Sequence, residues 1–316
     1  MLKIHFFNVA EGDAILLEYE SGDHPFRILV DAGRRILSES PGSLRQTAAA
    51  HLQKLNIRYI DALVLTHLHV DHIQDLPEIL DSVSFGTIFS TYFPPYPALR
   101  IPAVRSDLKA VRELPQDLNT LAESIQKAKR SGTKTVLVDR DRSIPLASPD
   151  GSILLRMPGK STLDFQNRIC DSLFHRIPVS EDDIYRAAKS RNQNSLRLRI
   201  DHAGRTIALD GDYYAADAEN EPQQTCDILK VAHHGDRKSM TERLAAMLRP
   251  KYAVVSCMRE YDAEKDRPSQ TALDHLRKHG AKIFYTDCFA ESGQQAEFHE
   301  EVLIVIEDNG DIRIVS

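Results

Sequence analysis

Apolar residues recur along the start of the chain in short runs whose spacing is typical of strands. Four runs have this pattern: residues 4–9 (IHFFNV), 14–19 (AILLEY), 26–33 (FRILVDAG) and 60–66 (IDALVLT). The first two are separated by a tight turn that contains Gly12, and the last two predict buried strands. Residues 45–57 have the composition of a helix, and residues 71–83 are also helical in pattern, with a break or a new helix start at Pro77.

The remainder of the chain continues this alternation of strands and helices. Seven further runs predict strands: 135–139, 152–157, 195–200, 205–212, 227–235, 252–257 and 282–287. Helices are predicted near 103–113, 117–130, 180–190, 240–248 and 270–279. Because no Pro-, Gly- or Ser-rich linker divides the chain, we expect an α/β protein with one domain over residues 1–316. This domain would contain two sheets and an extended insertion at about 92–190.

Composition and charge narrow the class of protein. The chain has 316 residues, 42% of them hydrophobic, and a net charge of −6, which argues against a surface that binds nucleic acid over its whole extent. The four cysteines are far apart and predict unpaired thiols: Cys170, Cys226, Cys257 and Cys288. The first residues resemble no export signal, and no apolar run is long enough for a membrane span. We therefore expect a cytoplasmic protein with no membrane contact.

Residues 66–72 (THLHVDH) carry the most informative pattern in the chain. Three histidines and an aspartate occur within six residues, directly after a predicted buried strand. Imidazole nitrogen and carboxylate oxygen are ligands that zinc prefers. His67 and His69 can point the same way and hold one metal, whereas Asp71 and His72 can reach a second metal or orient water on the first. The pattern predicts a metal site.

This motif resembles the signature of the metallo-β-lactamase superfamily. The rest of the chain resembles the ComEC-type branch, the hydrolase domain of the competence DNA-uptake channel. The motifs of that branch occur in order: NVAEGD (8–13), LVDAG (29–33), the histidine motif, NQNSL (192–196) with Asn194 and Ser195, DGD (210–212) and KVAHHG (230–235). The resemblance covers residues 1–90 and about 192–290, and it implies a four-layer αββα sandwich.

The resemblance also implies a site for one or two divalent ions, zinc or manganese. Asp212 resembles the carboxylate that bridges two metals, with Asp210 as the alternative. Neighbouring residues on a strand face opposite sides, so one of His233 and His234 is expected to bind metal. We expect His233 to bind it and His234 to face substrate or donate a proton. The expected ligands are His67, His69, Asp71, His72, Asp212 and His233, and the expected catalytic residues are Asp71 and His234.

The substrate is less strongly indicated than the reaction. The branch resemblance implies phosphodiester hydrolysis by metal-activated water, with nucleic acid as the substrate, and Lys230, Arg237 and Lys238 beside the HHG turn could neutralise a phosphate. The substrate-binding residues expected are Asn194, Lys238 and Arg267. One alternative is a hydrolase of small esters, lactones or phosphocholine-type substrates. Another is an inactive metal-binding module, and residues 92–190 are a candidate surface for a protein partner.

Arg267 occupies a position of special interest. In many relatives a histidine precedes a proline at the matching place and resembles a ligand of the second metal, whereas this chain has Arg267 before Pro268. Arginine has no lone pair with which to bind a metal. The second metal would then bind weakly, or Arg267 would clamp a substrate phosphate, or the residue would lie on a surface loop away from the site.

Overall fold

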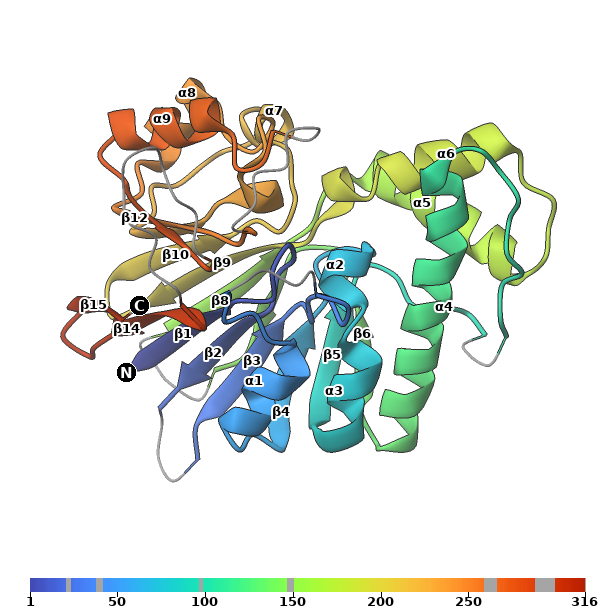
Figure 1. Cartoon of the computed structure of the whole chain (residues 1–316), viewed down its shortest axis with the longest axis horizontal. Coiled ribbons are helices and arrows are strands. Elements are labelled where there is room, and N and C mark those ends of the chain that lie inside the picture. Colours follow the sequence, from blue (N-terminus) through green and yellow to red (C-terminus); the bar gives the residue numbers. More distant parts are fainter. Residues whose placement is uncertain are drawn as a thin grey trace.

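Two β-sheets pack face to face, and helices cover their outer faces (Figure 1). The computed structural model describes residues 1–20, 24–37, 42–96, 99–146, 151–258, 266–287 and 299–315. The first sheet has the order β15 (Ile312–Val315), β14 (Glu301–Ile306), β1 (Leu2–Phe7), β2 (Ile15–Tyr19), β3 (Phe26–Val30), β4 (Tyr59–Val64), β5 (Ser84–Ser90) and β6 (Lys134–Leu137). The second has the order β13 (Lys282–Tyr285), β12 (Tyr252–Val255), β11 (Ile228–Lys230), β10 (Arg205–Leu209), β9 (Arg197–His202), β8 (Gly151–Arg156) and β7 (Arg142–Ile144).

Each sheet combines parallel and antiparallel strands. The strands from β3 to β6 are parallel, as are those from β10 to β13, and the other pairs are antiparallel. Parallel strands end at the same edge of a sheet. The loops after β4, β10 and β11 therefore start from carboxyl ends of parallel strands, where α/β proteins commonly build their sites.

Helices form the outer layers of the molecule. The outer face of the first sheet carries α1 (Ala48–Lys54), α3 (Leu76–Ser82) and α4 (Lys109–Arg130). The outer face of the second sheet carries α7 (Ala215–Ala218), α8 (Glu242–Leu248) and α9 (Gln270–Lys278). Two more helices, α5 (Lys160–Phe174) and α6 (Glu181–Lys189), lie beside the upper end of α4 in Figure 1. Among the helices that the structure describes, none is long and apolar enough to cross a membrane.

The alternation of side chains along each strand produces three apolar layers. On β4, Val64 packs between the two sheets, whereas Leu63 packs against the helices of the first sheet. On β12, Val254 packs between the sheets and Ala253 packs against the helices of the second sheet. All four side chains are fully buried. Three apolar layers separate four layers of secondary structure, which confirms the predicted αββα sandwich.

Most predicted elements are present, but two regions differ clearly from the prediction. A single helix, α4, replaces the two helices predicted over 103–130, although Pro115 lies inside it. A proline costs a helix interior about 3 kcal/mol, and the buried apolar face of α4, which includes Leu114 and Leu118, offsets this cost. The strand predicted over 227–235 was too long: β11 ends at Lys230, and Ala232–Gly235 form a short 3-10 turn, η2.

The segment 92–190, predicted to be an insertion, contributes strands to both sheets. It supplies the edge strand β6 of the first sheet and β7 and β8 of the second. The same segment contains α4, α5 and α6. Its strands are thus part of the sandwich, and its helices form the additional wall.

Candidate metal centre

The metal motif and the DGD and HHG motifs meet at one end of the sandwich. Residues 65–69 lead from β4 into the short helix α2 (Val70–Ile73), residues 210–212 follow β10, and η2 follows β11. These three loops lie at carboxyl ends of parallel strands, and their histidines and aspartates form clusters that could hold metal ions. Histidines and aspartates from three distant parts of the chain are therefore brought together.

His67, His69 and Asp212 form the first cluster. Nε2 of His67 lies 2.8 Å from Nδ1 of His69 and 3.7 Å from Oδ2 of Asp212. In a tetrahedral zinc site with metal–nitrogen bonds near 2 Å, neighbouring ligand atoms are about 3.3 Å apart. The two distances measured in this cluster, 2.8 and 3.7 Å, lie on either side of this value, so the three ligand atoms could surround one metal ion.

Asp71, His72 and His234 form the second cluster, and Asp212 of the first cluster lies beside its two histidines. Nε2 of His234 lies 3.3 Å from Oδ2 of Asp71 and 3.6 Å from Oδ1 of Asp212. Nε2 of His72 lies 3.5 Å from the same Oδ1 atom. These two nitrogens and Oδ1 of Asp212 are buried and have no hydrogen-bond partner among the described residues. Buried polar atoms without a partner are costly, so this donor set fits a divalent metal.

Neighbouring oxygen atoms orient the imidazole rings. Asp31 is fully buried, and Oδ2 accepts hydrogen bonds from Nδ1 of His72 at 2.7 Å and from the Thr66 hydroxyl at 2.6 Å. The carbonyl oxygen of Ser256 lies 3.0 Å from Nδ1 of His234. With their Nδ1 atoms engaged, both rings direct Nε2 toward Asp212, which is a common outer-shell arrangement for metal-binding histidines.

The charges of the cluster are those of a cation site. Burial lowers the pKa values of His67 and His69 well below the ordinary value, so both rings are neutral and keep a lone pair. Burial also opposes the charged form of His72, but the carboxylates of Asp212 and Asp31 raise the pKa of His72 well above the ordinary value. The negative charge that draws a proton to His72 would equally favour a metal ion.

Two glycines allow the loops to approach one another closely. A Cβ atom on Gly12 would lie 2.5 Å from the carbonyl oxygen of Asp71, and Gly12 has a φ of 142°. Gly211 has a φ of 53°, and its Cβ would lie 3.1 Å from Thr66. Glycine tolerates both the backbone conformation and the close contact. The EGD and DGD motifs are therefore needed to bring Asp13 and Asp212 against the histidine motif.

The geometry favours the opposite roles for His233 and His234 from those expected from sequence. Both residues lie in η2 with φ values of 48° and 55°, so the alternation of a strand does not apply to them. His234 is buried and joins Asp71 and His72, whereas His233 lies on the pocket side of Asp212. Nδ1 of His233 lies 2.6 Å from Oδ2 of Asp236, and Nε2 accepts a hydrogen bond from Nδ2 of Asn192 at 3.0 Å. The geometry favours His234 as the ligand.

The prediction that Lys230 neutralises a substrate phosphate is wrong. Its side chain is fully buried, and Nζ contacts the carboxylate of Asp13 and donates a 3.2 Å hydrogen bond to the carbonyl of Gly211. Nζ also lies 4.0 Å from Oδ1 of Asp212. Lys230 therefore compensates buried negative charge beneath the cluster and cannot reach a substrate. Asp210, the alternative to Asp212, pairs instead with Arg199.

Asn194, expected to bind substrate, lies away from the pocket. It is buried in η1 (Asn192–Asn194), and its Nδ2 donates to Oε1 of Gln166 at 2.9 Å, which ties η1 to α5. Asn192 lines the pocket in its place and contacts His233 and Tyr214. The NxxS spacing from Asn192 to Ser195 was the available signal for this residue. The Ser195 hydroxyl accepts a 3.2 Å hydrogen bond from the Asp212 amide.

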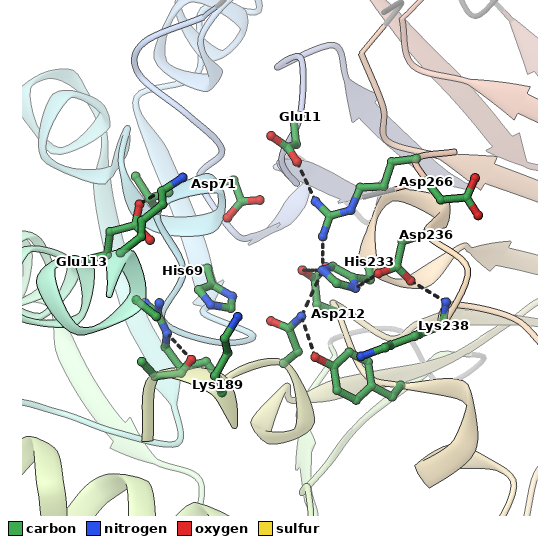
Figure 2. Close-up of a pocket in the computed structure, with 18 of the residues that line it drawn as sticks. Glu11, His69, Asp71, Glu113, Lys189, Asp212, His233, Asp236, Lys238 and Asp266 are labelled. Atoms are coloured by element: carbon green, nitrogen blue, oxygen red, sulfur yellow. Dashed lines mark hydrogen bonds and ion pairs between the residues drawn. The ribbon is translucent and has the colours of Figure 1, made fainter. Parts of the chain in front are cut away.

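A pocket of about 620 Å³ opens above the cluster. Figure 2 shows His69, Asp71 and Lys189 on one side and His233, Asp236 and Lys238 on the other. Among the described residues, seven basic side chains line the pocket: Arg34, Lys109, Lys189, Arg191, Arg237, Lys238 and Arg267.

Arg267 lies in this pocket, so its placement on a distant surface loop is wrong. Its Nη1 donates a 2.6 Å hydrogen bond to Oε1 of Glu11, and its Nη2 contacts Nε2 of His233. Its side chain is 11% exposed. A guanidinium ion is thus held in the pocket beside the candidate metal cluster.

Comparison with known proteins agrees with the structure. The family model described as "Beta-lactamase superfamily domain" matches residues 26–232, more than half of the chain. The chain is 26% identical to ComE operon protein 3 of Bacillus subtilis (strain 168) over 300 residues, which cover 88% of this chain and 32% of that protein. The chain therefore spans about a third of the length of this relative.

Solved structures that are similar to this chain include a metallo-β-lactamase fold protein and a tRNase. The metallo-β-lactamase fold protein YhfI from Bacillus subtilis has a TM-score of 0.44 and 15% identity, with 90% of this chain and 95% of that chain covered. Human tRNase Z, short form, has a TM-score of 0.41 and 15% identity, with coverage of 82% and 92%. From the family match, the chain belongs to the metallo-β-lactamase superfamily, and it is similar to the competence branch of that superfamily.

Proposed function

We propose that this superfamily hydrolase is a divalent-metal-dependent phosphodiesterase that acts on nucleic acid. The observation that carries the proposal is the placement of basic side chains in the same pocket as the metal cluster. Arg237, Lys238 and Arg267 lie on the His233 side, and Lys109 and Lys189 come from the helical wall. A phosphodiester is anionic, and cations around the reacting group stabilise it in the ground and transition states.

Two metal positions account for the cluster. His67, His69 and Asp212 would hold one ion, and Asp71, His72 and His234 would hold another with Asp212 between them. Divalent ions at these positions would lower the pKa of water to near neutral and neutralise the charge of the phosphate. Zinc fits the nitrogen-rich donors, and manganese fits the carboxylates.

His233 is the proton donor of the proposed reaction, in place of the expected His234. The carboxylate of Asp236 lies 2.6 Å from Nδ1 of His233 and would stabilise the charged ring, while Nε2 faces the pocket. In this structure Nε2 accepts from Asn192 and contacts Arg267, so it would carry a proton for the leaving oxygen atom once substrate has displaced these two donors. Asp71 also lines the pocket, where its carboxylate could orient the attacking water.

Arg267 is proposed as the phosphate clamp. Glu11 holds the guanidinium group of Arg267 in place through Nη1, and Nη2 of the same group contacts His233. A guanidinium group presents a planar fork that matches two phosphate oxygens. It would therefore stabilise the charge that develops on the phosphate oxygens during hydrolysis.

The proposal is tested by a substrate panel on protein loaded with zinc or with manganese. Methyl p-nitrophenyl phosphate, single-stranded DNA and RNA are compared with a chromogenic cephalosporin and simple lactones. We expect metal-dependent turnover of phosphodiesters and none of the cephalosporin. Turnover of a lactone without any turnover of phosphodiesters would instead favour the small-molecule hydrolase. An inactive protein that still binds metal would favour the partner module.

A further inference from the structure

Some of the basic side chains of the pocket form an ion pair with a carboxylate, and others do not. Arg34 and Arg267 pair with Glu11, Lys109 pairs with Glu113, and Arg191 contacts Asp117. Within the described ranges, the other three have no carboxylate at ion-pair distance: Lys189, Arg237 and Lys238. These three are exposed. Since their charges are uncompensated, they are the cations of the pocket that are available to a substrate.

The available cations lie on two sides of the metal cluster. Lys189 is the last residue of α6 and extends into the pocket beside His69, as Figure 2 shows. Lys238 follows η2 and lies on the side of His233 and Asp236. A compact substrate with one phosphate would need only the centre of the pocket. A chain of phosphates could contact both sides.

Tyr214 adds an aromatic surface on the side of the pocket where Lys238 lies. It is the one Phe or Tyr among the described residues that line the pocket, and it is half-buried. Its ring centroid lies 5.2 Å from Nζ of Lys238 and 5.9 Å from the ring centroid of His233. Nδ2 of Asn192 donates a 3.4 Å hydrogen bond to its hydroxyl. Aromatic faces combined with cations are the usual means of binding unpaired nucleic-acid strands.

The depth of the cluster favours an unpaired strand over a duplex. His67 is 2% exposed and Asp212 is 1% exposed, so a phosphate must enter the pocket to reach them. In a duplex the neighbouring bases are stacked and paired, whereas an unpaired strand can bend and turn a base out.

We infer that Tyr214 stacks on a base beside the scissile phosphate and that Lys189 binds a phosphate on the opposite side. The substrate is then an unpaired strand with at least two phosphates. Lys238 moves from the Tyr214 ring to a phosphate when the base stacks. This inference rests on the proposed phosphodiesterase function.

The test compares one oligonucleotide as a single strand and as a blunt duplex, with methyl p-nitrophenyl phosphate as the small diester, on metal-loaded protein. We expect kcat/KM for the single strand to exceed that for the duplex at least tenfold. Tyr214→Leu and Lys189→Gln should raise KM for the single strand about tenfold, well beyond their effects on the small diester. Tyr214→Phe keeps the ring, so it should retain most of the affinity that the leucine variant loses.

Salt dependence tests the phosphate contact separately. Lys189→Gln removes one phosphate contact with the single strand. The slope of log kcat/KM against log salt concentration should therefore become shallower by about 0.7. Tyr59→Leu and Lys129→Gln are the matched controls, because both side chains are exposed and neither lines the pocket. These controls should keep the wild-type slope and KM.

Equal losses on the single strand and on the small diester would overturn the inference, although the phosphodiesterase function would stand. Equal or faster cleavage of the duplex would overturn it as well. A protein that hydrolyses no diester would refute the proposed function itself. A phenylalanine variant as weak as the leucine variant would show that Tyr214 acts through its hydroxyl and not by stacking.

Discussion

Nη1 of Arg191 donates a 2.7 Å hydrogen bond to the carbonyl oxygen of Leu68, the residue between His67 and His69. The same guanidinium contacts Asp117 on α4, and its Nε donates to the carbonyl of Ala188 on α6 at 3.0 Å. Arg191 is buried, with 2% of its surface exposed. The helices of the segment 92–190 are therefore connected directly to the loop that carries His67 and His69, and we expect Arg191 to position these histidines.

Replacing Arg191 with Met should weaken both the fold and the metal site. It leaves the Asp117 carboxylate buried without its partner, which typically costs about 3–5 kcal/mol of unfolding free energy. It also frees the Leu68 carbonyl, so metal affinity should fall. The measurements are denaturant unfolding and a metal titration.

A second substitution separates the two effects of the Arg191 variant. Adding Asp117→Asn removes the unpaired charge and should recover part of the stability, but it does not restore the bond to Leu68. Metal affinity should therefore stay low in the double variant. Wild-type metal affinity in both variants would show that Arg191 only supports the fold.

His234 and His233 should respond differently to replacement with Ala. Wild-type protein purified without a metal-affinity resin should contain between one and two equivalents of zinc or manganese by elemental analysis. His234→Ala should lose metal, because Nε2 of His234 lies within 3.6 Å of both Asp71 and Asp212. His233→Ala should keep its metal and lose about 10²-fold or more in turnover, as expected for a proton donor. The reverse result would restore the order expected from sequence.

Asp31→Asn should weaken metal binding without disturbing the backbone. The φ of Asp31 is 59°, a conformation that asparagine also tolerates. The amide is a weaker acceptor for the Nδ1 proton of His72, and such outer-shell changes typically cost 10–100-fold in affinity. Asp210→Asn is the control, since Asp210 pairs with Arg199 and not with a cluster histidine. Equal affinities of the two variants would contradict the role of Asp31.

Arg267→Ala should reduce phosphodiester turnover at least tenfold, which corresponds to about 1.4 kcal/mol of barrier. Arg34→Ala is the matched comparison, because Arg34 also pairs with Glu11 and lines the pocket, at 3.5 Å from the carboxylate. It should cause a smaller loss. Arg267→His should leave metal stoichiometry unchanged, since both clusters are complete without residue 267. Tighter binding of a second metal in that variant would support the alternative of a missing ligand.

A buried histidine outside the site predicts pH-dependent stability. Nδ1 of His5 lies 2.8 Å from Glu301, and Nε2 lies 3.3 Å from Glu18, which also pairs with Arg27. Burial opposes the charge, but the two carboxylates raise the pKa of His5 to about 9. The stabilisation is complete below the unfolded pKa of about 6.5 and is lost as pH rises through about 9. Unfolding free energy should fall by about 3 kcal/mol between these values, and His5→Gln should remove most of that change.

The sequence alone determined the class of the fold and the position of its central motif. Strand periodicity is local, so the runs at 4–9, 14–19 and 60–66 predicted strands from neighbouring residues. The histidine motif is also local, because its three histidines and its aspartate all lie within residues 66–72. Pro77 correctly marked a new helix, since proline is tolerated in a first helical turn, and α3 begins at Leu76.

Only the tertiary structure decided what the residues outside that motif do. Lys230 and Asp13 are 217 positions apart, and no local pattern shows that a lysine next to HHG is buried under the cluster. The left-handed backbone of His233 and His234 depends on the packing of η2, so strand alternation does not apply to these two residues. Arg191 likewise donates a hydrogen bond to the carbonyl of Leu68, which is 123 positions away in the sequence. Hydrophobic periodicity predicts which residues are buried, whereas the partner of a polar side chain depends on which distant segments the fold places beside it.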